Sequence, residues 1–175
     1  MFTEKYKPKR VSEIIGQEKA ITSFNEWIKK WRKGNKALLL HGPPGSGKTS
    51  LIQAYANERN LDFIEMNASD FRTADQIKEV LGQSTRQMSL FGKGKIFLLD
   101  EIDGLSGRKD SGGVKEIIDL IKKSNYPIIL TANDPWNQKL RTLRTYCQLV
   151  EFSKINFYTN TKQEMHSILP KHLKE

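Results

Sequence analysis

Cysteine and histidine are scarce in this 175-residue sequence. The single cysteine, Cys147, rules out an internal disulfide, and we expect it to be a small buried hydrophobic residue. The three histidines, His41, His166 and His172, do not combine with it into a spacing typical of zinc sites. The sequence therefore predicts neither a disulfide scaffold nor a zinc site.

Long apolar runs are also missing. The longest runs have only the length of a strand, and the first residues, MFTEKYKPKR, lack the apolar stretch of a secretory signal. We therefore expect no membrane span and a cytoplasmic protein. The length is sufficient for one domain with a real core, or for part of a larger machine.

Acidic residues are too few to balance the basic ones. Lysine and arginine number 29 against 20 aspartates and glutamates, which gives a formal net charge of +9. Such an excess favours a polyanionic partner, most simply nucleic acid. Many basic proteins are merely well solvated, however, so composition leaves both alternatives open.

The order of apolar and polar residues predicts strands and helices in alternation. From Gln17 to Arg32, apolar residues recur at steps of three and four, which predicts a helix with one apolar face. Short apolar runs predict strands, with further helices between them. We therefore expect an α/β fold with a parallel sheet covered by helices on both faces. The predicted strands are 37–41, 61–66, 95–100, 126–131 and 147–152, and the later helices are 48–58, 74–83, one through 114–121, and 140–146.

The same pattern divides the chain into three parts. Residues 1–16 predict an ordered N-terminal arm, residues 17–153 the α/β core, and residues 154–175 a truncated or divergent tail too short for a second domain. Within the core, residues 104–113 are rich in glycine and charge and predict a loop.

The segment GPPGSGKT, Gly42 to Thr49, matches the phosphate-binding pattern G-x-x-x-x-G-K-[ST] in full. It follows a predicted strand and opens a predicted helix, so its backbone N–H groups can point at phosphate oxygens. Lys48 would reach the β- and γ-phosphates, and Thr49 would place its hydroxyl on Mg²⁺. The residues predicted to bind nucleotide are Gly42, Pro43, Pro44, Gly45, Ser46, Gly47, Lys48, Thr49 and Ser50, together with Asp100.

A second signal is IFLLDEID, in which a buried strand ends in Asp100 and Glu101. Asp100 can hold Mg²⁺ through its water shell, and Glu101 is placed to polarise a water for in-line attack on the γ-phosphate. A strand that simply ends in solvated acids is the alternative. A water-activating glutamate indicates an NTPase, because a small P-loop kinase needs none.

A third polar feature, Thr131-Ala132-Asn133-Asp134, ends the fourth predicted strand. If that strand neighbours the one carrying Asp100, Asn133 lies close to the γ-phosphate and the attacking water. The alternative is an ordinary turn before proline.

Together these residues resemble AAA+ ATPases of the clamp-loader clade, in particular the archaeal-type large subunits of replication factor C. The matching stretches are EKYKPKRVSEIIGQE, HGPPGSGKTS, MNASD, LLDEIDGL, ILTANDPW and LRTLRTYCQLVEF, and the resemblance covers residues 1 to about 156. The resemblance implies a three-layer core with a five-stranded sheet, and ATP with Mg²⁺ between the subunits of a pentamer that loads a sliding clamp onto primer–template DNA. It also implies that Asp100 is the Walker B acid, Glu101 the catalytic glutamate and Asn133 the sensor-1 residue.

The resemblance also bears on the arm and on DNA. The arm around Tyr6, Pro8 and 15–17 is similar to the wall that packs against adenine, although simple docking on the core explains it equally well. The family threads DNA past the loops that follow Walker B. Arg108, Lys109 and Lys115 could contact phosphates there, or form a solvated surface.

Two departures from the family qualify this resemblance. Small clamp-loader subunits carry Ser-Arg-Cys before the last strand, with an arginine that reaches the neighbour's ATP, whereas this sequence has Tyr146 at that arginine's place. Arg141 and Arg144 are not assigned the role, so we expect ATP hydrolysis to depend on partner subunits. The family continues into a helical lid with a sensor-2 arginine and a collar, which are missing here. We therefore expect a fragment, a truncated product, or a remainder encoded elsewhere.

Three other functions stay open at this stage. The first is a DNA-repair or checkpoint AAA+ protein that uses nucleotide as an assembly switch. The second is a small P-loop nucleotide kinase, which only the chain length favours. The third is a truncated scaffold that binds ATP without turning it over.

Overall fold

A computed structural model describes residues 7–68, 94–105 and 111–154. Its centre is a five-stranded sheet in the order β2-β3-β4-β1-β5, with every neighbouring pair parallel. The strands are β1 (Ala37–His41), β2 (Asp62–Asn67), β3 (Lys95–Asp100), β4 (Ile128–Ala132) and β5 (Cys147–Glu151). The helices are α2 (Glu18–Lys30), α3 (Lys48–Glu58), α5 (Ser111–Lys123) and α6 (Arg141–Thr145), with 3₁₀ helices η1 (Val11–Glu13), η3 (Ile102–Gly104) and η4 (Gln138–Leu140).

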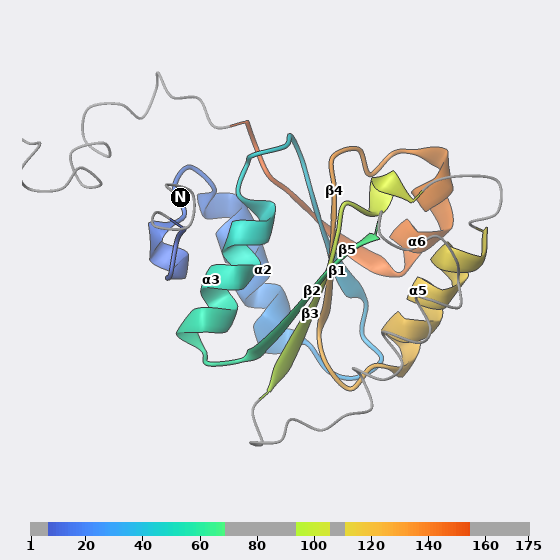
Figure 1. Cartoon of the computed structure of the whole chain (residues 1–175), viewed down its shortest axis with the longest axis horizontal. Coiled ribbons are helices and arrows are strands. Elements are labelled where there is room, and N and C mark those ends of the chain that lie inside the picture. Colours follow the sequence, from blue (N-terminus) through green and yellow to red (C-terminus); the bar gives the residue numbers. More distant parts are fainter. Residues whose placement is uncertain (1–6, 69–93, 106–110, 155–175) are drawn as a thin grey trace, which may run out of the picture.

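Helices cover both faces of the sheet, with α2 and α3 on one side and α5 and α6 on the other (Figure 1). Side chains alternate across each strand, so Leu38 and Leu40 of β1 join the core under α2 and α3, whereas Leu39 joins the core under α5 and α6. All three leucines are fully buried. The predicted three-layer α/β fold with a five-stranded parallel sheet is therefore confirmed.

Most element boundaries agree with the sequence-based expectations to within two residues. β4 begins at Ile128 and not at Tyr126, because Pro127 has no N–H to donate to the ladder. The predicted loop 104–113 was too long, since residues 111–113 already belong to α5. Packing of Val114, Ile117 and Ile121 against the sheet stabilises this helix despite its two glycines. The predicted helix 74–83 and the tail lie outside the described residues.

The described part of the N-terminal arm contains η1 and docks beside α3. Val11 and Ile14 pack against the core under α2 and α3, and the N–H of Val11 donates to Glu58 Oε2 at 3.2 Å. Cys147 is 4% exposed, as expected, and burial raises its pKa to about 12. Within the described ranges, no helix is long and apolar enough to cross a membrane.

The strand order explains where a binding site can form. In a parallel sheet, the carboxyl ends of all strands lie at the same edge, and ligands bind in the crevice outside that edge. β4 lies between β1, which leads into the phosphate loop, and β3, which ends in Asp100. The residues that follow β4 are therefore positioned between the loop and the acids.

Candidate nucleotide-binding site

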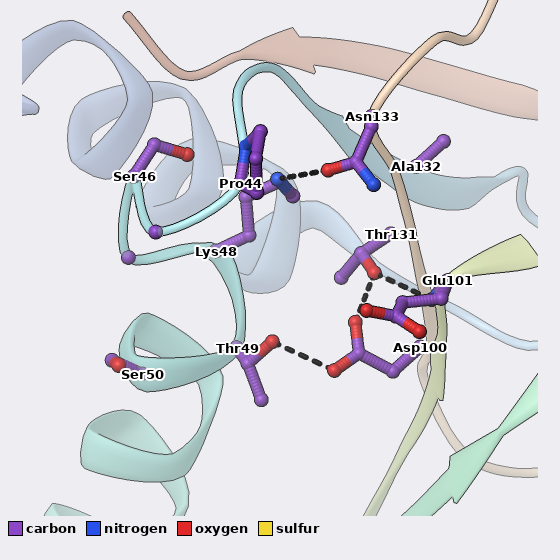
Figure 2. A pocket seen from close by; sticks show the side chains of 12 residues that line it. Pro44, Ser46, Lys48, Thr49, Ser50, Asp100, Glu101, Thr131, Ala132 and Asn133 are labelled. Atoms are coloured by element: carbon purple, nitrogen blue, oxygen red, sulfur yellow. Dashed lines mark hydrogen bonds between the residues drawn. The ribbon is translucent and has the colours of Figure 1, made fainter. Parts of the chain in front are cut away.

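One pocket at this edge brings the three sequence signals together (Figure 2). The phosphate loop forms one side of the pocket, and the end of β3 forms the opposite side. The end of β4 lies between them. Gly42 and Pro43 stand at the entrance of the loop and touch the site through their carbonyl groups. The pocket is lined by Pro44, Gly45, Ser46, Gly47, Lys48, Thr49, Ser50, Asp100, Glu101, Thr131, Ala132 and Asn133.

The shape of the phosphate loop depends on a close approach of two backbone segments. Gly42 has φ of +142°, and a Cβ at this position would lie 2.1 Å from the carbonyl oxygen of Phe152. The N–H of Phe152 in turn donates to the carbonyl of His41 at 2.7 Å. Only glycine fits here, and the segment after β5 thereby sets the path by which β1 enters the loop.

Lys48 is 8% exposed, yet its ammonium group has three oxygen partners. Nζ donates to the carbonyls of Gly42 at 2.8 Å and Pro43 at 2.9 Å, and to Asn133 Oδ1 at 3.2 Å. Desolvation lowers the pKa of Lys48, while Asp100 and the neighbouring acids raise it. A buried cation held by neutral oxygens is suited to an anionic ligand such as a phosphate group.

The acids at the end of β3 are held by hydroxyl groups from two directions. Thr49 Oγ1 donates to Asp100 Oδ2 at 2.8 Å, and the hydroxyl of Thr131 donates to Asp100 Oδ1. The N–H of Glu101 donates to Thr131 Oγ1 at 3.0 Å, and Glu101 Oε2 accepts from Asn67 Nδ2 at 3.2 Å. Hydroxyl and carboxylate oxygens in direct contact form the hard donor set that Mg²⁺ prefers, so Thr49 and Asp100 fit that ion.

Asn133 reaches the site because the turn after β4 is fixed by another acid. Asp103 Oδ2 accepts from the N–H of Asn133 at 2.9 Å and from the N–H of Asp134 at 3.3 Å. This arrangement directs the Asn133 side chain toward Lys48 (Figure 2). Asn133 therefore lines the pocket and contacts Lys48, and its predicted role as the sensor-1 residue stays a prediction.

Gln17, the residue directly after the arm, connects this part of the chain to the phosphate loop and to the segment after β5. Gln17 is only 3% exposed, and its side-chain Nε2 donates to the carbonyls of Ser46 at 3.2 Å and Ser153 at 2.8 Å. The N–H of Ser153 donates back to Gln17 Oε1 at 3.1 Å. Together with the packing of Val11 and Ile14, these contacts show that the described part of the arm docks on the core. Its contact with adenine stays a prediction, and Tyr6 lies outside the described residues.

The arginines near the last strand are not directed into the pocket. Arg144 Nη1 donates to the carbonyls of Pro135 and Asn137, the latter at 3.2 Å, and its guanidinium lies 5.1 Å from the ring centre of Trp136. Arg141 is exposed. Of the basic residues considered for DNA, Lys115 is exposed on α5, while Arg108 and Lys109 lie outside the described residues.

Sequence reasoning missed the supporting residues of this site. Thr131 enters the sequence analysis only as the first residue of Thr131-Ala132-Asn133-Asp134, and Asp103 only as the third acid of IFLLDEID. Asn67, at the end of β2, was noted only as part of MNASD. A polar residue inside an otherwise apolar strand was the available signal for Thr131. For Asn67 and Asp103, no sequence signal identifies the partner, because the partner follows a different strand of the sheet.

Comparison with known proteins agrees with this geometry. Residues 38–153 match the model of the "ATPase family associated with various cellular activities (AAA)". The chain is 51% identical over 158 residues to the replication factor C large subunit of Thermofilum pendens, covering 88% of this chain and 38% of that protein. It is 52% identical over 156 residues to the corresponding subunit of Ignicoccus hospitalis, with 86% and 33% covered.

A third relative, the replication factor C large subunit of Sulfolobus acidocaldarius, is 46% identical over 158 residues, covering 88% of this chain and 36% of that protein. The chain thus spans well under half the length of these relatives. The matched family model covers the sheet, the phosphate loop, Asp100, Glu101 and Asn133. The chain therefore belongs to the AAA family of ATPases.

Proposed function

We propose that the chain is the ATP-binding part of a clamp-loader subunit that uses ATP binding and hydrolysis to load a sliding clamp onto primer–template DNA. The observation that carries this proposal is the single pocket in which the phosphate loop faces both acids and Asn133, in a chain about half identical to replication factor C large subunits. The partners would be small clamp-loader subunits, in a hetero-oligomer that the resemblance predicts to be a pentamer.

The phosphate loop, the acids and Asn133 have separate roles in this proposal. The backbone N–H groups of the loop after its two prolines, from Gly45 to Thr49, bind the phosphates, and Lys48 exchanges its carbonyl partners for β- and γ-phosphate oxygens. Thr49 and Asp100 hold Mg²⁺, which would neutralise negative charge on the phosphate oxygens. Glu101 accepts a proton from the attacking water, and Asn133 positions that water beside the γ-phosphate.

The pocket lacks one element that phosphoryl transfer normally uses. Among the described residues, no arginine lines it, and Arg144 is held by backbone carbonyls elsewhere. An arginine supplied by a neighbour is worth about 10³–10⁵ in rate. We therefore propose that a partner subunit completes the site and that the isolated chain hydrolyses ATP slowly.

The test is steady-state ATP hydrolysis by the 175-residue chain, alone and with small clamp-loader subunits, a sliding clamp and primer–template DNA. The expected result is slow turnover alone and stimulation by the full set of partners. Rapid hydrolysis by the isolated chain would contradict the need for a partner. Assembly with the small subunits without any effect of clamp or DNA would favour the assembly-switch alternative, and phosphate transfer to a nucleoside monophosphate would favour a kinase.

A further inference from the structure

Thr131 is a polar residue in the interior of the sheet. It lies on β4 among Ile128, Ile129, Leu130 and Ala132, and it is 0% exposed. A hydroxyl in such surroundings destabilises the fold unless it is hydrogen-bonded. Its hydrogen-bond partners are Asp100, the last residue of β3, and the N–H of Glu101, which follows it, at the end of the strand that faces the pocket.

The two hydrogen bonds of Thr131 run in series. The N–H of Glu101 donates to Thr131 Oγ1 at 3.0 Å, and the same hydroxyl donates its only proton to Asp100 Oδ1 (Figure 2). The hydroxyl thus acts once as acceptor and once as donor. One side chain on β4 thereby contacts both acids that the proposed function uses.

The Thr131 side chain links β3 and β4 at the level where the backbone pairing of these strands ends. The ladder between β3 and β4 runs up to Leu99 opposite Leu130. At the next level stand Asp100 and Thr131, and there the hydroxyl links the strands. Glu101 has φ of +54°, a left-handed conformation that is uncommon for a residue with a side chain. Its N–H bond to Thr131 fixes the backbone at this turn, and therefore the direction in which its carboxylate leaves the strand.

Both carboxylate oxygens of Asp100 accept a hydrogen bond from a threonine hydroxyl, but the two threonines differ. Thr49 belongs to the phosphate loop and would turn its hydroxyl to Mg²⁺ when the metal binds, so its bond to Asp100 is exchanged. Thr131 also lines the pocket, but its one hydroxyl proton already goes to Asp100 and its oxygen accepts from the N–H of Glu101. We propose that Thr131 is a positioning residue, which holds Asp100 and the backbone of Glu101 in the orientation needed for Mg²⁺–nucleotide. This inference rests on the proposed binding of ATP and Mg²⁺, and not on the loading of a clamp.

The experiment compares nucleotide affinity in EDTA and across a Mg²⁺ titration, with a fluorescent ATP analogue and the 175-residue chain. Thr131→Val keeps the shape and removes the hydroxyl, whereas Thr131→Ser keeps the hydroxyl. Ile129→Val is the matched control, since Ile129 is equally buried on the same strand and does not line the pocket. Thermal melts establish that each variant is folded.

The expected result is a selective loss of metal response. In EDTA all four proteins bind the analogue alike, whereas Thr131→Val needs about 10–100-fold more Mg²⁺ for half-maximal binding, as expected when a group that orients a metal ligand is removed. Thr131→Ser and Ile129→Val stay within about twofold of the unmodified chain. If Thr131→Val does not fold, Thr131→Cys is used in its place, and its weaker S–H donor places it between the serine variant and complete loss.

Three outcomes would overturn the inference: an unchanged Mg²⁺ response in the valine or cysteine variant, an equal defect in the serine variant, or an equal loss in EDTA and in Mg²⁺. The last would show that Thr131 only maintains the fold. Because no clamp, DNA or partner subunit takes part, a positive result stands even if the chain loads no clamp. Conversely, Mg²⁺-dependent binding that Thr131→Val leaves unchanged would remove this inference and leave the proposed function intact.

Discussion

The two sides of the nucleotide pocket are shaped by different parts of the chain. On the phosphate-loop side, backbone groups dominate: Gly42 packs against the carbonyl of Phe152, and Lys48 is held by two loop carbonyls. On the acidic side, side chains dominate: the hydroxyls of Thr49 and Thr131 hold Asp100. The path of the loop is therefore set by close backbone packing, and the positions of the acids by individual side-chain hydrogen bonds.

This difference has a consequence for substitution. A side chain added to the loop collides with backbone, which cannot move aside without the strand behind it, so the effect reaches the whole fold. A side chain changed on the acidic side alters one or two hydrogen bonds, so the fold is retained while metal binding or hydrolysis changes. Substitutions on the two sides should therefore differ in whether they lower stability or change function alone.

Gly42→Ala is expected to have the largest effect, because its Cβ would lie 2.1 Å from Phe152 O at a φ of +142°. We expect a loss of at least about 3 kcal/mol in the free energy of unfolding, or no folded protein. Gly45→Ala is the matched control: its φ is +72°, but its Cβ would meet nothing within 4 Å. It is expected to lose about 1–2 kcal/mol. Denaturant unfolding measures both, and equal losses would contradict the importance of the Phe152 contact.

Glu101→Gln tests the acidic side, where function and fold should separate. The amide cannot accept the proton of the attacking water, so we expect stimulated ATP hydrolysis to fall about 10²–10⁴-fold. Nucleotide affinity and thermal stability should change little, because Glu101 is exposed and its backbone contact to Thr131 is kept.

The control for this variant is Glu26→Gln, an exposed glutamate of α2 outside the pocket. Hydrolysis by the assembly with partner subunits, clamp and DNA is compared with equilibrium binding of the ATP analogue. Full hydrolysis by Glu101→Gln would remove Glu101 from the proposed mechanism. A parallel loss of binding would show that the acidic side also maintains the loop.

Gln17→Glu tests whether the loop side depends on the arm. The carboxylate keeps an acceptor but faces the carbonyls of Ser46 and Ser153 without protons to donate, and the site is buried. We expect the free energy of unfolding at pH 7 to fall by about 2–3 kcal/mol. Gln148→Glu, on the exposed side of β5, should stay within about 0.5 kcal/mol. If Gln17→Glu were as stable as Gln148→Glu, the contacts of Gln17 with Ser46 and Ser153 would not contribute to stability.

The fold could be predicted well from the sequence because burial on both faces makes the central strands β1, β3 and β4 nearly continuous apolar runs. The phosphate loop and the acids could be located for a related reason: each follows such a run directly. The supports of the site could not. Gln17 meets Ser153 across 136 positions, and Thr131 meets Asp100 only because β4 lies beside β3. Strand order is a property of the packed sheet, and local sequence patterns do not contain it.

The smallest predicted effect concerns His41, which ends β1 just before the loop. Desolvation lowers its pKa below the ordinary 6.5, Glu151 opposes this, and Lys48 adds to it. In the folded state His41 therefore binds a proton less readily than in the unfolded chain. As pH falls through about 6.5, the unfolded chain takes up the proton first, so stability should decrease from there toward the lowered pKa.

His41→Gln removes this contribution, and the difference between the two proteins cancels the titration of the other groups. Because His41 is only half-buried, solvent screens the effect, and we expect a modest change confined to pH below about 7. Urea unfolding at several pH values from 5 to 8 measures it. If the unmodified chain instead gains stability over His41→Gln as pH falls, attraction to Glu151 outweighs desolvation. The loop side would then depend on a charge pair as well as on backbone packing, and the contrast with the acidic side would be weaker.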